Sequence, residues 1–316
     1  MTSKAFIGFL TIVLLTFIVY YDGIVYSTFL LDDFPNLQRL STVKSIYDIE
    51  GILGYSLNGI AGPTGRPLSL FTFALQESSW PNDPFYFKLV NFGVHIINGY
   101  LVYSILLLVF NFSTKGRDTR NSAALALVGS LIWLIHPIQT STVLYAVQRM
   151  TELSALFVFS GLLIYLHGRE LLIKNPDSNK GIVVISAAVF IGAFFGTLAK
   201  ENAILLCLYI ISFEITLFRK HSFKHKTLWS SIFLYIPLLT LLAYLVYRSF
   251  PYLLNDYPIR TFSAYERLIT EFRVITEYIS LIIIPRPNQF GLFHTDFLAS
   301  SSFFDFPIIL SFLFIS

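Results

Sequence analysis

Runs of apolar residues that are long enough to cross a lipid bilayer recur along this chain. The clearest occupy residues 5 to 21, 88 to 110, 181 to 199 and 227 to 247. A helix needs roughly 20 mostly apolar residues to cross the hydrocarbon core. Only 13% of the residues are charged, against about 25% in soluble domains. The sequence therefore predicts an all-α fold, a polytopic transmembrane helical bundle, and excludes a soluble domain.

Short basic gaps between the apolar runs predict the orientation of this bundle. Three gaps, spaced two crossings apart, hold clustered cations: Lys115, Arg117 and Arg120; Arg169, Lys174 and Lys180; Arg219, Lys220, Lys224 and Lys226. By the positive-inside rule these gaps face the cytoplasm, and so does the N-terminus. Residues 22 to 87 then form a long first extracytoplasmic loop, and residues 136 to 149, the Lys200-Glu201 turn and residues 249 to 264 form the later outer connections.

The first extracytoplasmic loop is not expected to be an extended linker. It contains apolar stretches such as Leu68 to Leu75, placed between the turn residues Gly62-Pro63 and Trp80-Pro81-Asn82. This pattern predicts short interfacial helices that lie along the membrane surface.

The net charge limits the class of partner, and the last part of the chain limits the domain organisation. The net charge of +3 is small and dispersed, which excludes nucleic acid as a partner. We interpret residues 1 to 316 as a single membrane-embedded domain, with the topology after residue 264 left open because residues 268 to 284 fit either a crossing or an interfacial helix. The last apolar run begins near Phe303 and is too short to span a bilayer. We therefore expect either a truncated C-terminal end or a re-entrant element there.

An acidic pair just beyond the first apolar run is the sharpest anomaly. Asp32 and Asp33 precede a Phe34-Pro35 turn. Adjacent carboxylates repel, so one of them is expected to have a raised pKa. The pair fits a general base, or an anchor for a divalent metal and phosphate at the membrane surface. A solvated helix exit fits the same residues. As the base, Asp33 is favoured over Asp32, because it adjoins the Phe34-Pro35 turn.

A second charged pair interrupts a long apolar region. Lys200 and Glu201 stand between the runs at residues 181 to 199 and 202 to 218. Sequence neighbours do not face each other on a helix, so each needs its own partner. The pair fits contacts with a lipid phosphate and a substrate hydroxyl, or an ordinary hairpin tip. Because both charged pairs are assigned to extracytoplasmic ends, Asp32 and Asp33 are predicted to lie close to Lys200 or Glu201 in the folded protein.

Polar side chains also form a stripe on the second long apolar run. Asn91, His95 and Asn98 recur at helical spacing, which places them on one face. Such a stripe must face protein or a cavity. It fits hydrogen bonding between helices, and also a ligand contact.

The outer hairpin at residues 136 to 149 and the first outer loop supply further candidates. His136 begins a His-Pro-Ile-Gln-Thr motif, and Arg149 and Glu152 are one helical turn apart. Arg149 and Glu152 are expected either to pair with each other or to act separately, with Arg149 binding a phosphate through its planar donor fork. Arg66, before Pro67, is a similar cation.

These anomalies occur in an order that resembles a known family. The series is the acidic pair, Gly65-Arg66-Pro67-Leu68, Leu89-Val90-Asn91 with His95 and Asn98, the His136 motif, Gln148-Arg149-Met150-Thr151-Glu152-Leu153, Ala199-Lys200-Glu201, and finally Ile284-Pro285-Arg286-Pro287 through Gly291-Leu292-Phe293-His294 and Asp296-Phe297. It resembles the transmembrane, tetratricopeptide-repeat-containing O-mannosyltransferases and their bacterial relatives, within the GT-C superfamily. The repeat tail is missing, and Ser141 stands where relatives carry glutamate.

The resemblance implies a function and a set of site residues. Such enzymes move a sugar from a polyprenyl or dolichyl phosphate carrier to an extracytoplasmic acceptor, here expected to be a protein Ser or Thr hydroxyl. Asp32 and Asp33 are the implied catalytic group. Lys200, Arg149 and Arg66 are expected to bind the donor phosphate. The remaining candidates for the substrate cavity are Glu201, His136, Glu152, Asn91 and His95. No metal site or cofactor is assigned, although Asp32 and Asp33 leave a divalent metal open.

Three alternatives stay open at this point. The acceptor is also consistent with a lipid or a cell-envelope glycan. A transporter or lipid-carrier scaffold would place its charges at mid-membrane, whereas here the charges gather near the outer ends of the runs. An inactive fragment that depends on a partner is the third. The expected location is a multi-pass integral membrane protein, in a bacterial inner membrane rather than the endoplasmic reticulum, with its site on the extracytoplasmic face.

Overall fold

The computed structural model of the chain describes residues 3–114, 116, 119–255, 262–286, 289–290, 299–300, 302 and 308. Every regular element among them is helical, and none of these residues lies in a strand, so the predicted all-α fold is confirmed for this part of the chain. The chain divides into two compact units, residues 1–238 and residues 239–316. The candidate site lies entirely in the first unit.

Five helical segments are long and apolar enough to cross a membrane, and a bent pair would make a sixth. The five are Ser3–Tyr26, Pro84–Ser113, Ala146–Lys174, Asn179–Ala199 and Lys226–Tyr244. The bent pair joins Thr119–Ile135 to Pro137–Leu144 with a 48° change of direction. These segments are compatible with a multi-pass integral membrane protein, and they contain the four apolar runs seen in the sequence except for the last three residues of the fourth.

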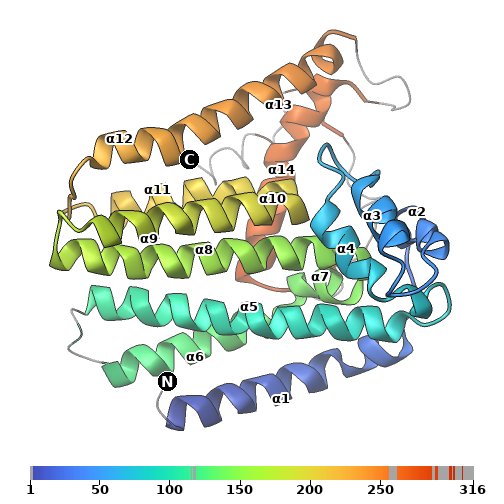
Figure 1. Ribbon diagram of the computed structural model, residues 1–316, viewed down its shortest axis with the longest axis horizontal. Coiled ribbons are helices and arrows are strands. Elements are labelled where there is room, and N and C mark those ends of the chain that lie inside the picture. Colours follow the sequence, from blue (N-terminus) through green and yellow to red (C-terminus); the bar gives the residue numbers. More distant parts are fainter. Residues whose placement is uncertain are drawn as a thin grey trace. The chain divides into compact units, whose positions relative to one another are not determined.

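The first unit is a bundle of long helices (Figure 1). Its members are α1 (Ser3–Tyr26), α5 (Pro84–Ser113), α6 (Thr119–Ile135), α8 (Arg149–Lys174), α9 (Asn179–Val189), α10 (Gly196–Ala199), α11 (Leu206–Thr216) and α12 (Lys226–Ser230), with π-helical turns η5 (Phe190–Phe195) and η7 (Ser231–Tyr235) before α10 and α13. Glycines allow the closest approach: a Cβ on Gly161 of α8 would lie 2.9 Å from the carbonyl oxygen of Ala188 in α9. Small residues at such contacts let membrane helices pack backbone to backbone.

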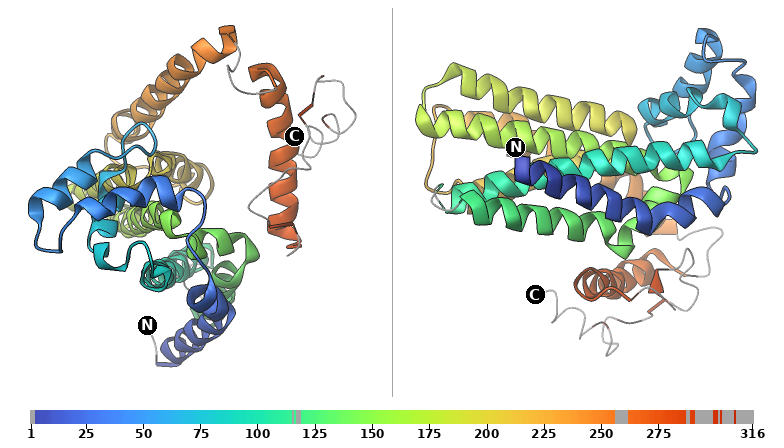
Figure 2. Two further views of the ribbon diagram at one scale, coloured as in Figure 1. Left: turned by 90° about the vertical axis from the view of Figure 1, so that its right-hand side faces the viewer. Right: turned by 90° about the horizontal axis from the view of Figure 1, so that it is seen from below.

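The two ends of this bundle differ in content (Figures 1 and 2). At one end, which we call the basic end, lie the turns between α5 and α6, between α8 and α9, and between α11 and α12; the backbone N–H of Lys224 donates to the carbonyl of Pro176 there, at 3.1 Å. At the other end, the site end, residues 27–83, the 136–148 hairpin and the 200–201 turn meet. The predicted outer connections of the first unit therefore share one end.

Arg169 was assigned to a basic gap, but the structure places it inside α8 with no exposed surface. Its Nε lies 2.6 Å from Oε1 of Glu214, and Nζ of Lys226 lies 2.7 Å from Oε2 of the same carboxylate. Arg169 therefore joins α8 to α11 and α12 at the basic end, and it is a packing residue rather than a solvated topology signal.

Short helices build the predicted first outer loop. They are α2 (Asp33–Leu37), α3 (Ile49–Leu57) and α4 (Pro67–Ala74), with 3-10 turns η1 (Gln38–Thr42) and η2 (Glu77–Ser79). Asp48 caps α3 by accepting from the backbone N–H of Gly51, and Pro67 begins α4, as expected for residues at helix N-termini. Leu37, Leu40, Phe73 and Phe87 of this segment are buried in one core cluster with Tyr145 to Val147 and Met150. The segment is thus built of short helices joined by turns.

The 136–148 hairpin is a series of short turns: η3 (Pro137–Gln139), α7 (Thr140–Leu144) and η4 (Ala146–Gln148), before α8 begins. Pro137 cannot continue the helix that ends at Ile135, which explains the bend there. Lys200 is extended, and η6 (Glu201–Leu205) follows it before α11. At 11 residues, α11 is not among the candidate membrane spans.

The second unit holds most of α13 (Ile236–Asn255) and α14 (Ala264–Ile283). Ser263 and Glu266 form a capping box at the start of α14. The charges along α14 keep it out of the candidate spans. Lys115 and Arg117, Pro287, the Gly291 to Phe297 motif and the final apolar run, apart from Ile308, lie outside the described residues.

Candidate functional site

Asp33 is fully buried at the first turn of α2. Its Oδ2 accepts from the backbone N–H of Leu30, and its Oδ1 from the backbone N–H of Val147, each at 2.8 Å. Burial raises the pKa of Asp33 to about 6, an effect that these two N–H groups and the charge of Lys88 partly offset. A raised pKa was expected from repulsion by Asp32, but the dominant cause in the structure is burial.

Asp32 has the opposite environment, since its side chain is exposed. Its backbone N–H donates to the hydroxyl of Tyr145, and this hydroxyl also hydrogen-bonds the Asp32 side chain. Tyr145 is buried at the end of α7. A buried tyrosine thus fixes the backbone and the carboxylate of an exposed aspartate, which is the arrangement needed to present a base to an incoming hydroxyl.

These environments reverse the order of preference within the acidic pair. The Phe34-Pro35 turn favoured Asp33 as the base. In the structure both oxygens of Asp33 accept backbone N–H groups, and the side chain does not reach solvent. Asp32 is therefore the better candidate for contact with an acceptor, and Asp33 holds the segment in place.

A metal at the acidic pair does not fit these donors. Because Asp33 is committed to Leu30 and Val147, Asp32 alone is free to coordinate. In the part of the chain that the structure describes, no group of three or more His, Cys, Asp or Glu side chains comes together. Divalent cations held by proteins take several oxygen ligands, so we derive no step through a metal.

Lys88 is a buried cation that the sequence reasoning missed. It has no exposed surface, its Nζ donates to Ser27 Oγ and to the carbonyl of Thr28 at 2.8 Å, and its charge acts on Asp33. Its spacing from Asn91 and His95 places it on the same helical stripe, which is the signal that would have identified it. Lys88 anchors the exit of α1 beside the acidic pair.

Arg66 and Glu201 form an ion pair across the site end. Arg66 Nη2 lies 3.1 Å from Glu201 Oε2, with side chains 20% and 21% exposed. The Thr64 hydroxyl donates to Glu201 Oε1 at 2.9 Å. Burial opposes ionisation of Glu201, but hydrogen bonds from its own backbone, Arg66 and Thr64 outweigh it and lower the pKa. Glu201 therefore holds the loop before α4 in place.

Lys200 does not share the partner of its neighbour Glu201, as expected for adjacent residues. Its Nζ donates to Thr151 Oγ1 at 2.7 Å. Burial, followed by repulsion from Arg66, lowers the pKa of Lys200, and Glu201 opposes that shift. Two cations thus lie close enough to interact at the site end, with Glu201 as the acid that neutralises one of them.

The structure links the acidic pair to Lys200 indirectly. Sequence reasoning predicted that Asp32 and Asp33 lie close to Lys200 or Glu201. The contacts of the described residues include none directly between the two pairs. Both instead reach the start of the same segment, Asp33 through the N–H of Val147 and Lys200 through the hydroxyl of Thr151, four positions later. Both charged pairs lie at the site end of the bundle. The cation whose charge acts on Asp33 is Lys88.

Arg149 is enclosed by protein. It has no exposed surface, and its three nitrogens donate to Asn91 Oδ1 at 2.8 Å, the carbonyl of Thr72 at 3.1 Å and that of Phe87 at 3.0 Å. The guanidinium also lies 4.6 Å from the centre of the Phe73 ring. The predicted phosphate contact of Arg149 does not fit this environment, because each guanidinium nitrogen already serves an internal acceptor.

Glu152 does not pair with Arg149, contrary to one of the two expectations. It faces α5, where Oε1 lies 3.1 Å from His95 Nδ1 and Oε2 accepts from Asn98 Nδ2 at 2.7 Å. Asn91, His95 and Asn98 have no exposed surface, so the prediction that the stripe faces the bundle interior is confirmed. These residues join α5 to α8, and they do not line an open pathway.

His136 has a local role in the structure. Its Nδ1 accepts from the backbone N–H of Ile138 at 3.2 Å, which caps η3 after the break in α6. The side chain is half-buried. This contact belongs to the bend of the hairpin.

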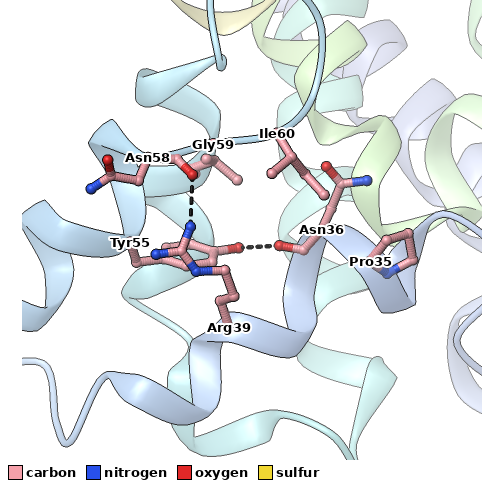
Figure 3. Close-up of a pocket in the computed structure, with 8 residues that line it drawn as sticks. Pro35, Asn36, Arg39, Tyr55, Asn58, Gly59 and Ile60 are labelled. Atoms are coloured by element: carbon pink, nitrogen blue, oxygen red, sulfur yellow. Dashed lines mark hydrogen bonds between the residues drawn. The ribbon is translucent and has the colours of Figure 1, made fainter.

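A small hollow lies beside α2 (Figure 3). Arg39 donates to the carbonyl of Asn58 at 2.7 Å, and the Tyr55 hydroxyl to the carbonyl of Asn36 at 2.8 Å. The hollow has a volume of about 10 Å³, which corresponds to about one water molecule. Among the residues that line it, Asn36 has a side-chain oxygen, Oδ1, that is buried without a hydrogen-bond partner. The hollow is too small for a sugar ring.

No protein-family model, no curated protein and no solved structure matches this chain.

Proposed function

We propose that this chain is a membrane glycosyltransferase of the GT-C type, which moves a sugar from a polyprenyl or dolichyl phosphate carrier to a hydroxyl of an extracytoplasmic acceptor protein. The observation that carries the proposal is the contrast within the acidic pair: exposed Asp32 is fixed by Tyr145, while buried Asp33 fixes the segment. The ordered motifs of the sequence support the same class of enzyme.

In the proposed reaction Asp32 removes the proton from the acceptor hydroxyl. The hydroxyl oxygen forms a bond to the anomeric carbon of the sugar, and the bond from that carbon to the phosphate oxygen breaks. The electron pair of that bond leaves with the phosphate, and the anomeric configuration inverts. A general base contributes typically 10²- to 10⁴-fold to the rate.

Arg66 and Lys200 are the proposed cations for the leaving phosphate, because both are partly exposed and close enough to repel each other. Negative charge grows on the phosphate as the bond breaks, so cations there stabilise the transition state more than the bound donor. A phosphate would also relieve the repulsion between the two cations. Arg149 has no part in this group.

The test is transfer from a polyprenyl-phosphate sugar to acceptor protein by the purified full chain in vesicles. Asp32→Asn is expected to lower the transfer rate at least 10²-fold while membrane insertion stays unchanged, since Asn cannot take a proton. Glu50→Gln, which alters another exposed carboxylate of the same segment, is the control and should retain activity. Undiminished transfer by Asp32→Asn would remove Asp32 from the catalytic role. Absence of transfer by the unaltered chain with every polyprenyl-phosphate sugar supplied would remove the proposed function.

A further inference from the structure

A cavity at the basic end of the bundle plays no part in the proposed reaction. It has a volume of about 950 Å³ and lies among α1, α5 and α6. Binding sites for small molecules typically occupy about 300–1,000 Å³. We infer that this cavity binds one anionic phospholipid of the membrane leaflet at the basic end.

The lining of the cavity has a charged rim and an apolar floor. Lys4 and Arg120 are exposed cations on the rim, and among the described residues neither forms an ion pair and no acidic side chain lines the cavity. Tyr103, Leu107 and Leu127 provide the floor. This division matches a phospholipid, whose phosphate needs cations and whose acyl chains need an apolar surface.

A buried polar group in the same cavity supports a head-group contact. Asn111 lines it, and its Oδ1 is buried without a hydrogen-bond partner. A buried acceptor without a partner is destabilising, and a hydroxyl of a lipid head group would supply the missing donor. The amide is thus suited to a glycerol-type head group.

The position of the cavity also fits a lipid. Lys4 is the second residue of the first candidate span, and Arg120 is the second residue of α6, so both cations lie at the end of an apolar helix. Basic pockets between membrane helices on the cytoplasmic side bind anionic head groups. The positive-inside rule assigns the basic end to that side.

Native mass spectrometry of the purified full chain tests the inference, with dioleoylphosphatidylglycerol and dioleoylphosphatidylcholine supplied in equal amounts. One phosphatidylglycerol is expected to be retained in preference to phosphatidylcholine. Each basic residue near an anionic lipid adds about fivefold to binding, so Lys4→Gln with Arg120→Gln should lower retention about 25-fold. Both side chains are exposed, and the double variant should fold normally.

Two further variants sharpen the test. Lys220→Gln with Lys224→Gln removes two exposed cations of the basic end that do not line the cavity, and retention should stay unchanged. Ala123→Trp places a large side chain in the cavity and should abolish retention while both cations remain. Equal retention of phosphatidylcholine, unchanged retention in the Lys4 and Arg120 variant, or displacement of the lipid by millimolar inorganic phosphate would overturn the inference.

Discussion

The carboxylate of Asp33 accepts a hydrogen bond from the backbone N–H of Val147, with the two atoms 2.8 Å apart. The contact is fully buried and joins α2 to η4, more than a hundred positions later in the chain. It fixes the geometry of the whole site end, because Asp32 precedes it directly and Arg149 follows Val147 by two residues.

Asp33→Ala is therefore expected to destabilise the protein strongly. The substitution leaves the N–H groups of Leu30 and Val147 buried without acceptors, at about 1–3 kcal/mol each. Thermal unfolding in detergent, followed by tryptophan fluorescence, measures the effect. Asp32→Ala is the matched comparison and should change the melting temperature little, since that side chain is exposed; similar losses in the two variants would contradict the assignment of roles.

The pKa of Asp33 predicts how stability varies with pH. Burial raises this pKa from 3.8 to about 6, so between these values the folded protein binds more protons than the unfolded chain. The contribution of Asp33 to stability is fully present below about pH 4 and is lost as the pH rises through 6. Asp33→Asn does not titrate, so the stability difference between the two proteins should change between pH 4 and 6 and stay constant above pH 7. A constant difference across the whole range would contradict the raised pKa.

Arg149→Lys should reduce stability although it keeps the charge. Lysine has one nitrogen and cannot replace the three donors that reach Asn91, Thr72 and Phe87. Leaving such acceptors unpaired in a buried site costs several kcal/mol. We expect low expression and a lower melting temperature for Arg149→Lys, whereas Arg66→Lys should fold normally and lower the rate of sugar transfer. A stable Arg149→Lys variant with a specific loss of donor binding would instead restore the phosphate role.

Gly62→Ala tests the loop held by Glu201. Gly62 has a φ of +65°, which disfavours a side chain, and an added Cβ would lie 2.3 Å from Glu201 Oε1. The substitution should displace Glu201 from Arg66 and Thr64, lowering the melting temperature and weakening binding of the sugar donor. Gly54→Ala, in helix α3 with open space around it, should be neutral or slightly stabilising. Equal behaviour of the two variants would argue against the Glu201 contact.

Tyr145→Phe separates positioning of Asp32 from catalysis itself. The change removes the hydroxyl that contacts the backbone and side chain of Asp32 while keeping the buried ring. Transfer is expected to fall about 10-fold, because Asp32 loses the contact that holds it toward the acceptor. Activity identical to the unaltered chain would exclude the positioning role.

The sequence alone determined the class of fold and the burial of the α5 stripe. Apolar runs of membrane-spanning length depend only on local composition, since hydrocarbon requires the backbone to satisfy its own hydrogen bonds. The interior position of Asn91, His95 and Asn98 followed from helical spacing and from the cost of polar groups in lipid. Both are local arguments, and both were confirmed.

Tertiary structure alone decided which charged residues are free to act. Asp32 and Asp33 are neighbours with the same side chain, yet only one of them is enclosed by the backbone of a distant segment. The same holds for the two arginines. Three carbonyl or amide oxygens surround the guanidinium of Arg149, whereas that of Arg66 pairs with Glu201 and is partly exposed. Apart from Leu30, the partners of these groups come from positions 50 to 140 residues away, and no local pattern encodes which distant donors and acceptors will meet a given side chain.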